Sequence, residues 1–306
     1  MKIAIIGRTE FLYDTALRLH ALGHRITCVL TAKEAPEYKR TAADFEALAE
    51  QWGIPFAQGP RIIDHTNFLK ASSSDIAVSI NYTGVVPQEV IDIFPLGILN
   101  AHAGDLPRYR GNATLAWPIL NGEERIGLCI HRMIGGELDS GDILSREYLK
   151  IDHNTKIGKV WDWMARLTPH LMSEAIEKLE RNPDYILEIQ SKNPMDALRC
   201  YPRKPEDAKI DWGANAIDVL RLINASNRPY SGAFCELDGD NIIVWDAELV
   251  VDDEQYCAVS GQVTKVGDGY IEVACGIGKL RVLLVEYQGK MSEPSEIVKS
   301  IRKRLK

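Results

Sequence analysis

The sequence predicts an α/β protein with a Rossmann-like N-terminal domain and a smaller C-terminal domain made of short strands. A continuous apolar run at residues 3–6, typical of a buried strand, precedes a helix at 10–22 and a second strand at 25–30. This β-α-β order is how a doubly wound sheet begins. After residue 233 the pattern changes to short strands separated by Gly turns, and 306 residues are enough for two domains.

The remaining N-terminal elements follow from apolar periodicity and from capping residues. Only Gly7 of the G-x-G-x-x-G fingerprint follows the first strand, so a dinucleotide cofactor is not expected. Thr41 begins a capped amphipathic helix, and Asn154 or Thr155 caps a long helix that ends at Asn182. Strands are expected at residues 76–80, 96–99, 126–133 and 143–150, and helices at 41–53, 87–94, 112–121 and 155–182.

The C-terminal part has the pattern of a small β-barrel. Residues 190–211 are polar and contain prolines, which indicates a linker, and a helix is expected at 215–225. The Asp238-Gly239 and Asp268-Gly269 pairs are hairpin signals. The basic end of the chain, residues 299–306, is expected to be a solvated tail that frays. Strands are expected at residues 233–237, 242–251, 261–266, 270–274 and 280–287.

Composition excludes several classes of protein. The hydrophobic fraction of 45% and the charged fraction of 26% are ordinary for a soluble globular protein. A net charge of -7 argues against broad binding to nucleic acid, which is therefore not expected as a partner. The six cysteines include no C-x-x-C pair, which indicates reduced thiols and a cytoplasmic location. No apolar stretch reaches the roughly 20 residues that span a bilayer, so no membrane is expected either.

Asn100 and His102 form the strongest candidate for a reactive site. Both follow the apolar run at 96–99, and their two-residue spacing directs the side chains to one face of a strand. Ligands of open α/β sheets bind at the edge where such strands end. An amide can donate a hydrogen bond to a developing oxyanion, and an imidazole can accept a proton near neutral pH. Asp139 can bring a carboxylate to the same place.

Each of these residues also has a structural alternative. A single histidine near a strand end is more often a packing residue than a base. Asp139 and Asp142, on either side of Gly141, are typical of Asx turns. Arg8, at the first strand-to-helix turn, can meet a phosphate or sugar, or can be a solvated surface residue. A metal site would need more convergent carboxylates than this spacing offers, so no metal is expected.

Taken together, the motifs resemble those of the folate-dependent formyltransferase family. That family carries an Asn, a His two residues later, a Leu-Pro-x-Tyr-Arg-Gly turn and a downstream Asp-x-Gly-Asp segment, here at residues 100, 102, 106–111 and 139–142. Residues 202–212 and 228–234 resemble the family's C-terminal domain, which is similar to an OB-fold. The resemblance implies a Rossmann-like catalytic formyltransferase domain, a linker and a smaller OB-like domain, at residues 1–189, 190–211 and 212–306.

The same resemblance implies roles for single residues. The donor would be 10-formyltetrahydrofolate, which leaves as tetrahydrofolate. His102 would take the proton from the attacking amine, Asn100 would hold the oxyanion on the formyl carbon, and Asp139 would orient His102 and favour its charged form. The turn after strand 76–80 would line the pterin pocket. The folate-binding residues implied are Tyr82, Gly84, Val85 and Asp142.

Members of the family differ in the amine that they formylate. Residues 31–40 form a shorter segment than the basic loop of the family's tRNA branch and include two Glu, and the acidic net charge points the same way. The expected branch is therefore the nucleotide-sugar one, which formylates UDP-linked 4-amino-4-deoxy sugars for surface glycans such as lipopolysaccharide or pseudaminic-acid-type glycans. The substrate-binding residues expected on this reading are Arg8, Tyr109, Asn112, Arg203 and Trp212.

Three alternatives stay open. The first is a methionyl-tRNA formyltransferase, whose C-terminal domain this one resembles. The second is an oligonucleotide-binding role for the barrel, as in other OB-like folds. The third is a non-catalytic folate- or nucleotide-binding protein, against which the intact Asn100, His102 and Asp139 argue. The sequence leaves the oligomeric state open, with a homodimer as one candidate.

Overall fold

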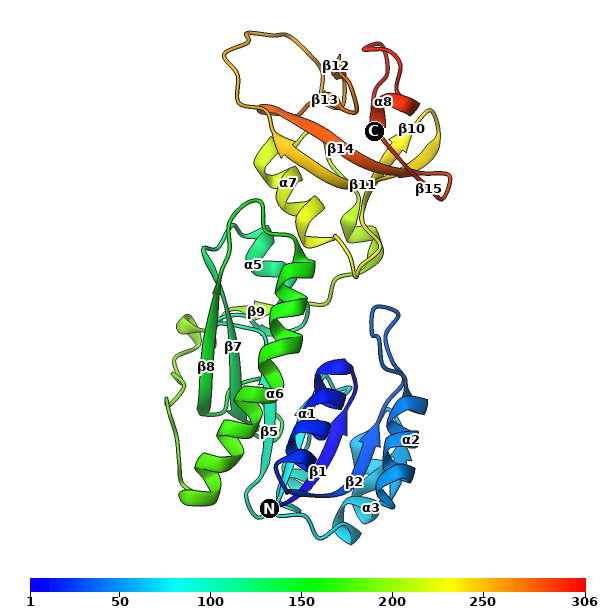
Figure 1. The fold of residues 1–306 in the computed structure, drawn as a ribbon. Coiled ribbons are helices and arrows are strands. Elements are labelled where there is room, and N and C mark those ends of the chain that lie inside the picture. The colour runs from blue at the N-terminus through cyan, green and yellow to red at the C-terminus, as the bar shows by residue number, and fades with distance from the viewer. The chain divides into compact units, whose positions relative to one another are not determined.

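The computed structural model describes residues 1–306, which form two compact units (Figure 1). The first unit consists of residues 1–114, 126–149 and 161–200, and the second of residues 115–125, 150–160 and 201–306. The expected domain limits at residues 189 and 211 stay a prediction.

A seven-stranded sheet forms the centre of the first unit, in the order β3-β2-β1-β4-β5-β7-β8. The first five strands in the chain pair in parallel, and β7 pairs with β5 in the antiparallel sense. The predicted α/β class with a Rossmann-like sheet is therefore confirmed. The strands are β1 (Lys2–Gly7), β2 (Arg25–Thr31), β3 (Phe56–Gln58), β4 (Ile76–Ile80), β5 (Ile98–His102), β7 (Arg125–Arg132) and β8 (Ile143–Lys150).

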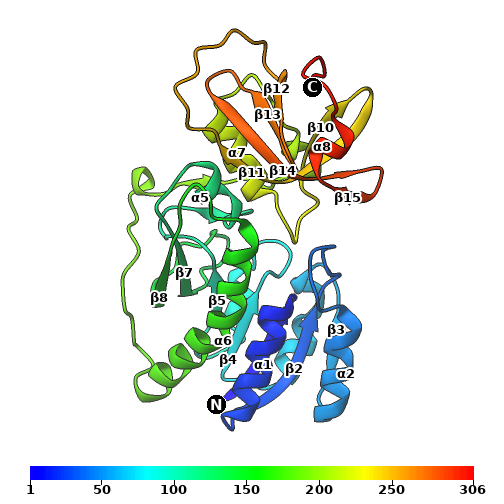
Figure 2. The ribbon, with the colours of Figure 1, turned by 45° about the horizontal axis from the view of Figure 1, so that its top comes forward.

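Helices cover this sheet because parallel strands need crossover connections, which bury both faces. Helices α1 and α6 lie side by side (Figures 1 and 2). The rings of Phe11 of α1 and Trp161 of α6 pack together, with centroids 5.0 Å apart. An apolar cluster joins the sheet to η1, α3 and α4, with Ile98 among its members. The helices of this unit are α1 (Glu10–Ala21), α2 (Ala42–Trp52), η1 (Ile62–His65), α3 (Thr66–Ala71), α4 (Gln88–Ile91) and α6 (Ile157–Arg181), of which α6 begins in the second unit.

The strand order reverses between β1 and β4, and Gly7 makes their close approach there possible. A Cβ atom on Gly7 would lie 2.1 Å from the carbonyl oxygen of Ile80, and its φ of +134° is in the region that favours glycine. Arg8 N–H donates to the same carbonyl oxygen at 3.0 Å. Such a reversal is where open α/β sheets bind their ligands.

Several short elements were not predicted. The two-residue strands β6 (Arg110–Gly111) and β9 (Arg199–Cys200) pair in parallel, so part of the expected linker belongs to the first unit. Gln190 is also buried, and its side chain donates to the carbonyl oxygen of Asp139 at 3.0 Å. The polar composition of residues 190–211 hid these contacts, since two-residue strands carry no periodicity. The segment also holds η2 (Pro194–Asp196) and η3 (Pro205–Ala208).

The second unit is built on an antiparallel sheet of order β10-β11-β14-β13-β12, with β15 beside β14. Its core is apolar, and α7 packs against β11 and β14. The Asp238-Gly239 hairpin is present as predicted, with both residues at positive φ. The elements are α5 (Ala116–Leu120), α7 (Ala216–Ala225), β10 (Ala233–Leu237), β11 (Asp240–Leu249), β12 (Val263–Val266), β13 (Ile271–Ala274), β14 (Lys279–Tyr287), β15 (Lys290–Ser292) and α8 (Pro294–Ile297).

The expectation of a fraying C-terminal tail was wrong. Leu305 is only 2% exposed, it bridges to Leu237, and its N–H donates to the carbonyl oxygen of Gly261 at 2.8 Å. One apolar side chain among basic neighbours therefore anchors the end of the chain. The prediction rested on the basic charges of residues 299–306. It took no account of Leu305, whose burial alone contributes about 1.5–3 kcal/mol.

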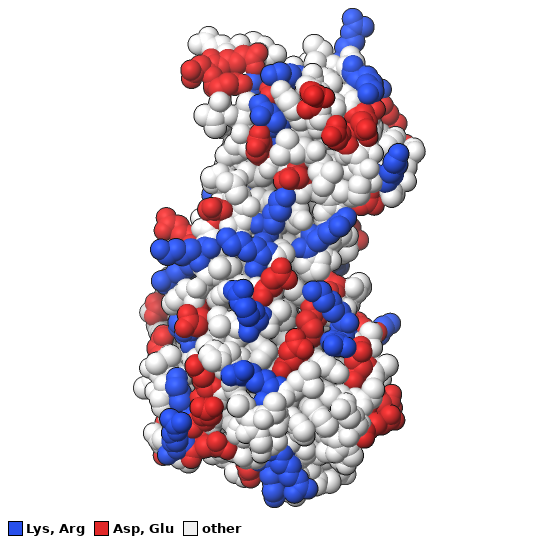
Figure 3. Space-filling view, viewed as in Figure 1, with Lys and Arg blue, Asp and Glu red and all other residues white.

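Charges of both signs are interspersed over the face of the molecule that Figure 3 shows. No helix in residues 1–306 combines the length and the apolar character needed to cross a membrane.

Candidate active site

The strand β5 presents Asn100 and His102 on one face of the sheet, as their spacing predicts. In the antiparallel ladder with β7, Asn100 lies opposite His131 and His102 lies opposite Cys129. Opposed residues of an antiparallel pair project to the same side. Asn100, His102 and His131 are therefore neighbours on one face.

His102 is buried and held at both ring nitrogens. Its Nε2 lies 2.7 Å from the carbonyl oxygen of Tyr109, and its Nδ1 lies 3.5 Å from Oδ2 of Asp139. A carbonyl oxygen only accepts, so Nε2 carries a proton and donates to Tyr109. In the neutral ring the lone pair is then on Nδ1, the atom that faces the carboxylate.

Asp139 is the centre of the cluster. Its Oδ2 accepts from Gly111 N–H at 2.8 Å, and its Oδ1 lies 3.5 Å from Nε2 of His131. Its φ of +49° places it in the left-handed region that Asp tolerates in turns. The predicted convergence of Asp139 with His102 is thus present in the structure.

Burial and charge together set the protonation states. Burial lowers the pKa of His102 below its ordinary value, and the Asp139 carboxylate opposes that shift. Burial by itself would raise the pKa of Asp139, but His102, His131 and Gly111 N–H hold it well below the usual range. At neutral pH the site therefore pairs a neutral imidazole with a charged carboxylate, which is the state that a proton acceptor requires.

The loop after β5 supplies the carbonyl of Tyr109 and is fixed from two sides. Arg146 of β8 forms an ion pair with Asp105 at 2.6 Å and donates to the carbonyl oxygen of Leu106 at 2.7 Å. Gly104 allows the loop to turn back, because a Cβ there would lie 2.5 Å from the carbonyl oxygen of Tyr109 and 2.7 Å from Nε2 of His102. Leu106-Pro107 is a cis peptide.

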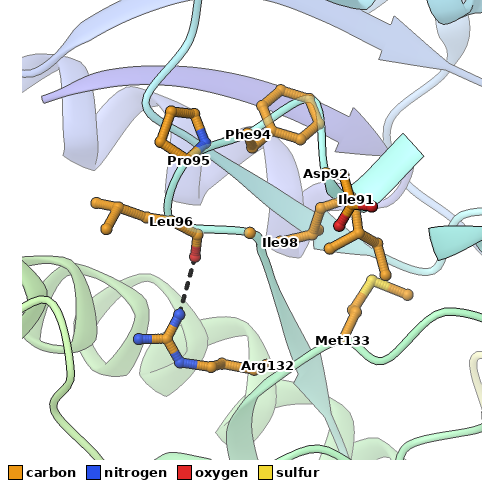
Figure 4. Close-up of a pocket in the computed structure, with 9 residues that line it drawn as sticks. Ile91, Asp92, Phe94, Pro95, Leu96, Ile98, Arg132 and Met133 are labelled. Atoms are coloured by element: carbon orange, nitrogen blue, oxygen red, sulfur yellow. Dashed lines mark hydrogen bonds between the residues drawn. The ribbon is translucent and has the colours of Figure 1, made fainter. Parts of the chain in front are cut away.

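Ile98 of β5 lies two residues before Asn100, and Met133, the residue after β7, lies two residues after His131; both line a surface cavity of about 260 Å³ (Figure 4). Since side chains alternate, both share the face of Asn100 and His131. Arg132 donates to the carbonyl oxygen of Leu96 at 2.9 Å, the dashed line in Figure 4. The lining residues are Ile91, Asp92, Phe94, Pro95, Leu96, Gly97, Ile98, Arg132 and Met133.

The residues expected to bind folate lie on two turns of the first unit. The Tyr82 hydroxyl donates to the carbonyl oxygen of Gly59 at 2.7 Å, and burial raises its pKa to about 12. Gly84 has a φ of +80° with open space around it, and Val85 is 51% exposed. Asp142 accepts from Gln190 N–H at 3.2 Å. No hydrogen bond or ion pair joins any of these four residues to Asn100, His102 or Asp139.

The residues expected to bind the acceptor are scattered over both units. Arg8 donates to the carbonyl oxygens of Asn81 at 2.9 Å and Lys33 at 2.6 Å, at the edge where β1, β2 and β4 end. Tyr109 touches His102 through its backbone, and the Asn112 side chain accepts from Arg199 at 3.4 Å.

Arg203 and Trp212 belong to the second unit. Arg203 donates to Ser226 at 3.2 Å, and Trp212 is 3% exposed within the core of that unit.

Sequence reasoning assigned no role in the site to His131. It is 1% exposed and contacts both Asn100 and Asp139. One signal in the sequence was available: His131 is a polar ring within the apolar run that forms β7, the antiparallel neighbour of β5. Residues 1–306 contain no group of three or more His, Cys, Asp or Glu side chains arranged to hold a metal ion. The expectation that the protein binds no metal stays a prediction.

Comparison with known proteins identifies relatives across both units. Residues 1–176 match the family described as formyl transferase, and residues 203–302 match its C-terminal domain. The methionyl-tRNA formyltransferase of Herminiimonas arsenicoxydans is 34% identical, with 98% of this chain and 97% of that protein covered. The methionyl-tRNA formyltransferase of Citrifermentans bemidjiense is 30% identical, with 96% of this chain and 92% of that protein covered.

Solved structures share the fold at lower identity. WlaRD, a sugar 3N-formyl transferase solved with dTDP and 5-N-formyl-THF, has a TM-score of 0.68 at 18% identity and covers 95% of this chain and 98% of its own. HypX from Aquifex aeolicus in complex with tetrahydrofolic acid has a TM-score of 0.61 at 17% identity and covers 98% of this chain and 47% of its own.

These relatives correct the expected acceptor. The prediction of a UDP-linked amino sugar was wrong, because the full-length relatives at 26% to 34% identity carry the name methionyl-tRNA formyltransferase. The short segment 31–40 and the acidic net charge led to the wrong acceptor. Neither feature shows where on the surface a nucleic acid would be contacted. Contacts to a nucleic acid are local and are made by few side chains.

Proposed function

Because this chain belongs to the formyl transferase family and is an enzyme that transfers a formyl group from formyltetrahydrofolate, we propose that its acceptor is the amine of methionyl-tRNA. The observation that supports this acceptor is the coverage of the relatives. Two methionyl-tRNA formyltransferases at 30% and 34% identity align over 92% and 97% of their own length. The similarity thus includes the C-terminal domain as well as the catalytic one.

The proposed chemistry is an addition followed by an elimination. The neutral amine attacks the formyl carbon, and the C=O electron pair moves to oxygen, where the Asn100 amide N–H stabilises the charge. The amine gives its proton to Nδ1 of His102, the ring nitrogen that Tyr109 leaves unprotonated. The oxyanion then re-forms the C=O bond as the bond from the formyl carbon to the folate nitrogen breaks, and that nitrogen takes the proton from His102 and leaves as tetrahydrofolate.

Asp139 has a supporting role in this proposal. Its Oδ2 lies 3.5 Å from Nδ1 of His102, so the carboxylate stabilises the imidazolium as the proton arrives. Gly111 N–H holds the same oxygen at 2.8 Å and keeps the carboxylate in place. No covalent enzyme intermediate is needed.

The cavity lined by Ile98 and Met133 is the proposed pocket for the pterin ring. Two residues along a strand correspond to roughly 7 Å, so a flat ring there lies one step from the Asn100 amide. The apolar side chains of Ile91 and Ile98 suit the faces of a conjugated ring, and the charged side chains of Asp92 and Arg132, which line the same cavity, suit its polar edge. Tyr82, Gly84, Val85 and Asp142 stay proposed as further folate contacts.

Formyl transfer to charged tRNA tests the proposal directly. The purified full chain receives 10-formyltetrahydrofolate with methionyl initiator tRNA, uncharged tRNA, free methionine or UDP-linked amino sugars. Formylmethionine released from the charged tRNA alone, with a rate that falls as salt is raised, is the expected result. A formyl mass gain on another amine, with none on methionyl-tRNA, would overturn the acceptor and leave the family assignment intact.

A further inference from the structure

His131 lies directly opposite Asn100 in the β5·β7 ladder and is 1% exposed. Its Nδ1 lies 2.8 Å from the carbonyl oxygen of Arg132. Since a carbonyl oxygen only accepts, Nδ1 carries the proton of the neutral ring. Nε2 is then left with its lone pair, and this tautomer is set by the backbone alone.

That lone pair faces the amide of Asn100. Nδ2 of Asn100 lies 3.2 Å from Nε2 of His131, so the amide donates one of its two N–H bonds to the ring. The two ends of an amide have almost the same shape, and packing distinguishes them poorly. In the reversed orientation Oδ1 would meet the lone pair of Nε2, and two acceptors would repel each other.

We infer that His131 is a positioning residue that selects the orientation of the Asn100 amide and so directs its second N–H at the formyl oxygen. This inference rests on the proposed role of Asn100 as the oxyanion donor. A reversed amide would present a partly negative oxygen to the developing negative charge. The orientation of Asn100 therefore decides whether it helps or opposes the reaction.

Asp139 is the other polar group near Nε2, and it is the weaker partner. Its Oδ1 lies 3.5 Å from Nε2, against 3.2 Å for the amide nitrogen of Asn100. With the proton on Nδ1, the neutral ring has no hydrogen at Nε2 to give to a carboxylate, and only the protonated ring lowers the pKa of Asp139 from that side. The ring of His102 lies edge-on to that of His131, with centroids 6.2 Å apart. Its Nε2–H donates to the carbonyl oxygen of Tyr109 and not to His131. His131 thus acts through Asn100 and not through the His102–Asp139 pair.

Four variants separate these possibilities. His131→Phe keeps a ring of similar shape without an acceptor, and His131→Gln supplies an amide oxygen that can accept from Asn100. Asn100→Ala removes the proposed target, and Asp139→Asn changes the competing partner. His170→Phe is the matched control, because its side chain is 52% exposed on α6.

We expect His131→Phe to lower kcat about tenfold with the donor KM unchanged within about twofold, since it misdirects a donor without altering the cavity. His131→Gln is expected to restore kcat to within about threefold of the unmodified enzyme. Asn100→Ala by itself should lower kcat about 100- to 1,000-fold, and adding His131→Phe to it should lower kcat hardly any further. His170→Phe should have no effect.

Two results would overturn the inference. One is a further tenfold loss on adding His131→Phe to Asn100→Ala. The other is a loss that disappears in the Asp139→Asn background instead, which would place the effect of His131 on the carboxylate. If His131→Phe acted only by loosening the fold, it would raise the donor KM, and His131→Gln would not restore kcat.

An NMR measurement on the full chain keeps this result separate from the choice of acceptor. A scalar coupling across the hydrogen bond between Nδ2 of Asn100 and Nε2 of His131 is expected without any substrate, and it should vanish in His131→Phe. Its absence in an enzyme active on methionyl-tRNA would overturn the inference. Its presence in an enzyme inactive on methionyl-tRNA would support the inference and overturn the proposed acceptor.

Discussion

The carbonyl oxygen of Tyr109 lies 2.7 Å from Nε2 of His102, although Tyr109 is in the loop and His102 ends the strand. This contact assigns the ring proton to Nε2 and leaves Nδ1, the nitrogen nearer Asp139, as the basic atom. The backbone of Tyr109 therefore decides which nitrogen of His102 carries the proton of the neutral ring.

Loss of the base should abolish most of the turnover. We expect His102→Ala to lower kcat by about 100- to 10,000-fold, the usual contribution of a general base, with little change in donor affinity. His170→Ala, an exposed histidine of the same unit, is the control and should keep full activity. Formyl transfer measured by mass spectrometry checks both, and a near-normal rate in His102→Ala would exclude the proposed mechanism.

The acid limb of the pH profile should follow His102. Burial lowers the pKa of this imidazole below its ordinary value of 6.5, so the ring stays neutral and basic until the pH falls below that value. Asp139 raises the same pKa, and Asp139→Asn should therefore move the limb to lower pH while lowering kcat. The profiles are compared with one acceptor, so that the amine of the acceptor contributes equally. Movement of the limb to higher pH in Asp139→Asn would contradict the assignment.

Gly104 should tolerate no side chain. A Cβ there would overlap the carbonyl oxygen of Tyr109 and the His102 ring, so Gly104→Ala should lower the free energy of unfolding by about 1–3 kcal/mol and kcat by at least about tenfold. Gly136→Ala is the control, because Gly136 has a φ of +77° but open space around it. It should lose about 1 kcal/mol of stability and keep its kcat. Equal losses of kcat would show that stability alone governs the rate.

Arg146 should stabilise the loop that carries Tyr109. Its side chain is 8% exposed and pairs with Asp105, which is 22% exposed, and with Glu188, which is 47% exposed. Arg146→Met removes this cation and its hydrogen bond to the Leu106 carbonyl, and should cost about 1–3 kcal/mol of unfolding free energy. Arg181→Met removes an exposed pair with Glu177 and should change stability by less than about 0.5 kcal/mol. Chemical denaturation measures both. A loss below about 1 kcal/mol for Arg146→Met would show that the loop that carries Tyr109 keeps its conformation without Arg146.

Filling the cavity should weaken donor binding. We expect Met133→Trp to raise the donor KM by at least about tenfold, because a ring from the protein would occupy the space proposed for the pterin. Met195→Trp is the control, since Met195 is 86% exposed. Fluorescence titration with tetrahydrofolate gives the affinity of each variant. Unchanged affinity in Met133→Trp would place the pterin elsewhere.

Sequence reasoning succeeded where one strand or helix carries its own signal. The apolar run at residues 76–80 gave β4 with its observed bounds, and the spacing of Asn100 and His102 gave their common face. It failed where the signal is a contact between distant segments: the β6·β9 pair, the burial of Leu305 and the opposition of His131 to Asn100. The acceptor was also misjudged, because net charge does not locate the few side chains that meet a nucleic acid.

The pairing of β6 with β9 has a consequence for the order in which the protein matures. Gly111, whose N–H donates to the Asp139 carboxylate, lies in β6 and pairs with Cys200 of β9. During synthesis the sheet can therefore assemble long before this donor has its partner. A nascent chain released before residue 200 would have its strands but no ordered reaction centre, so competence comes only after the helix α6 has left the ribosome.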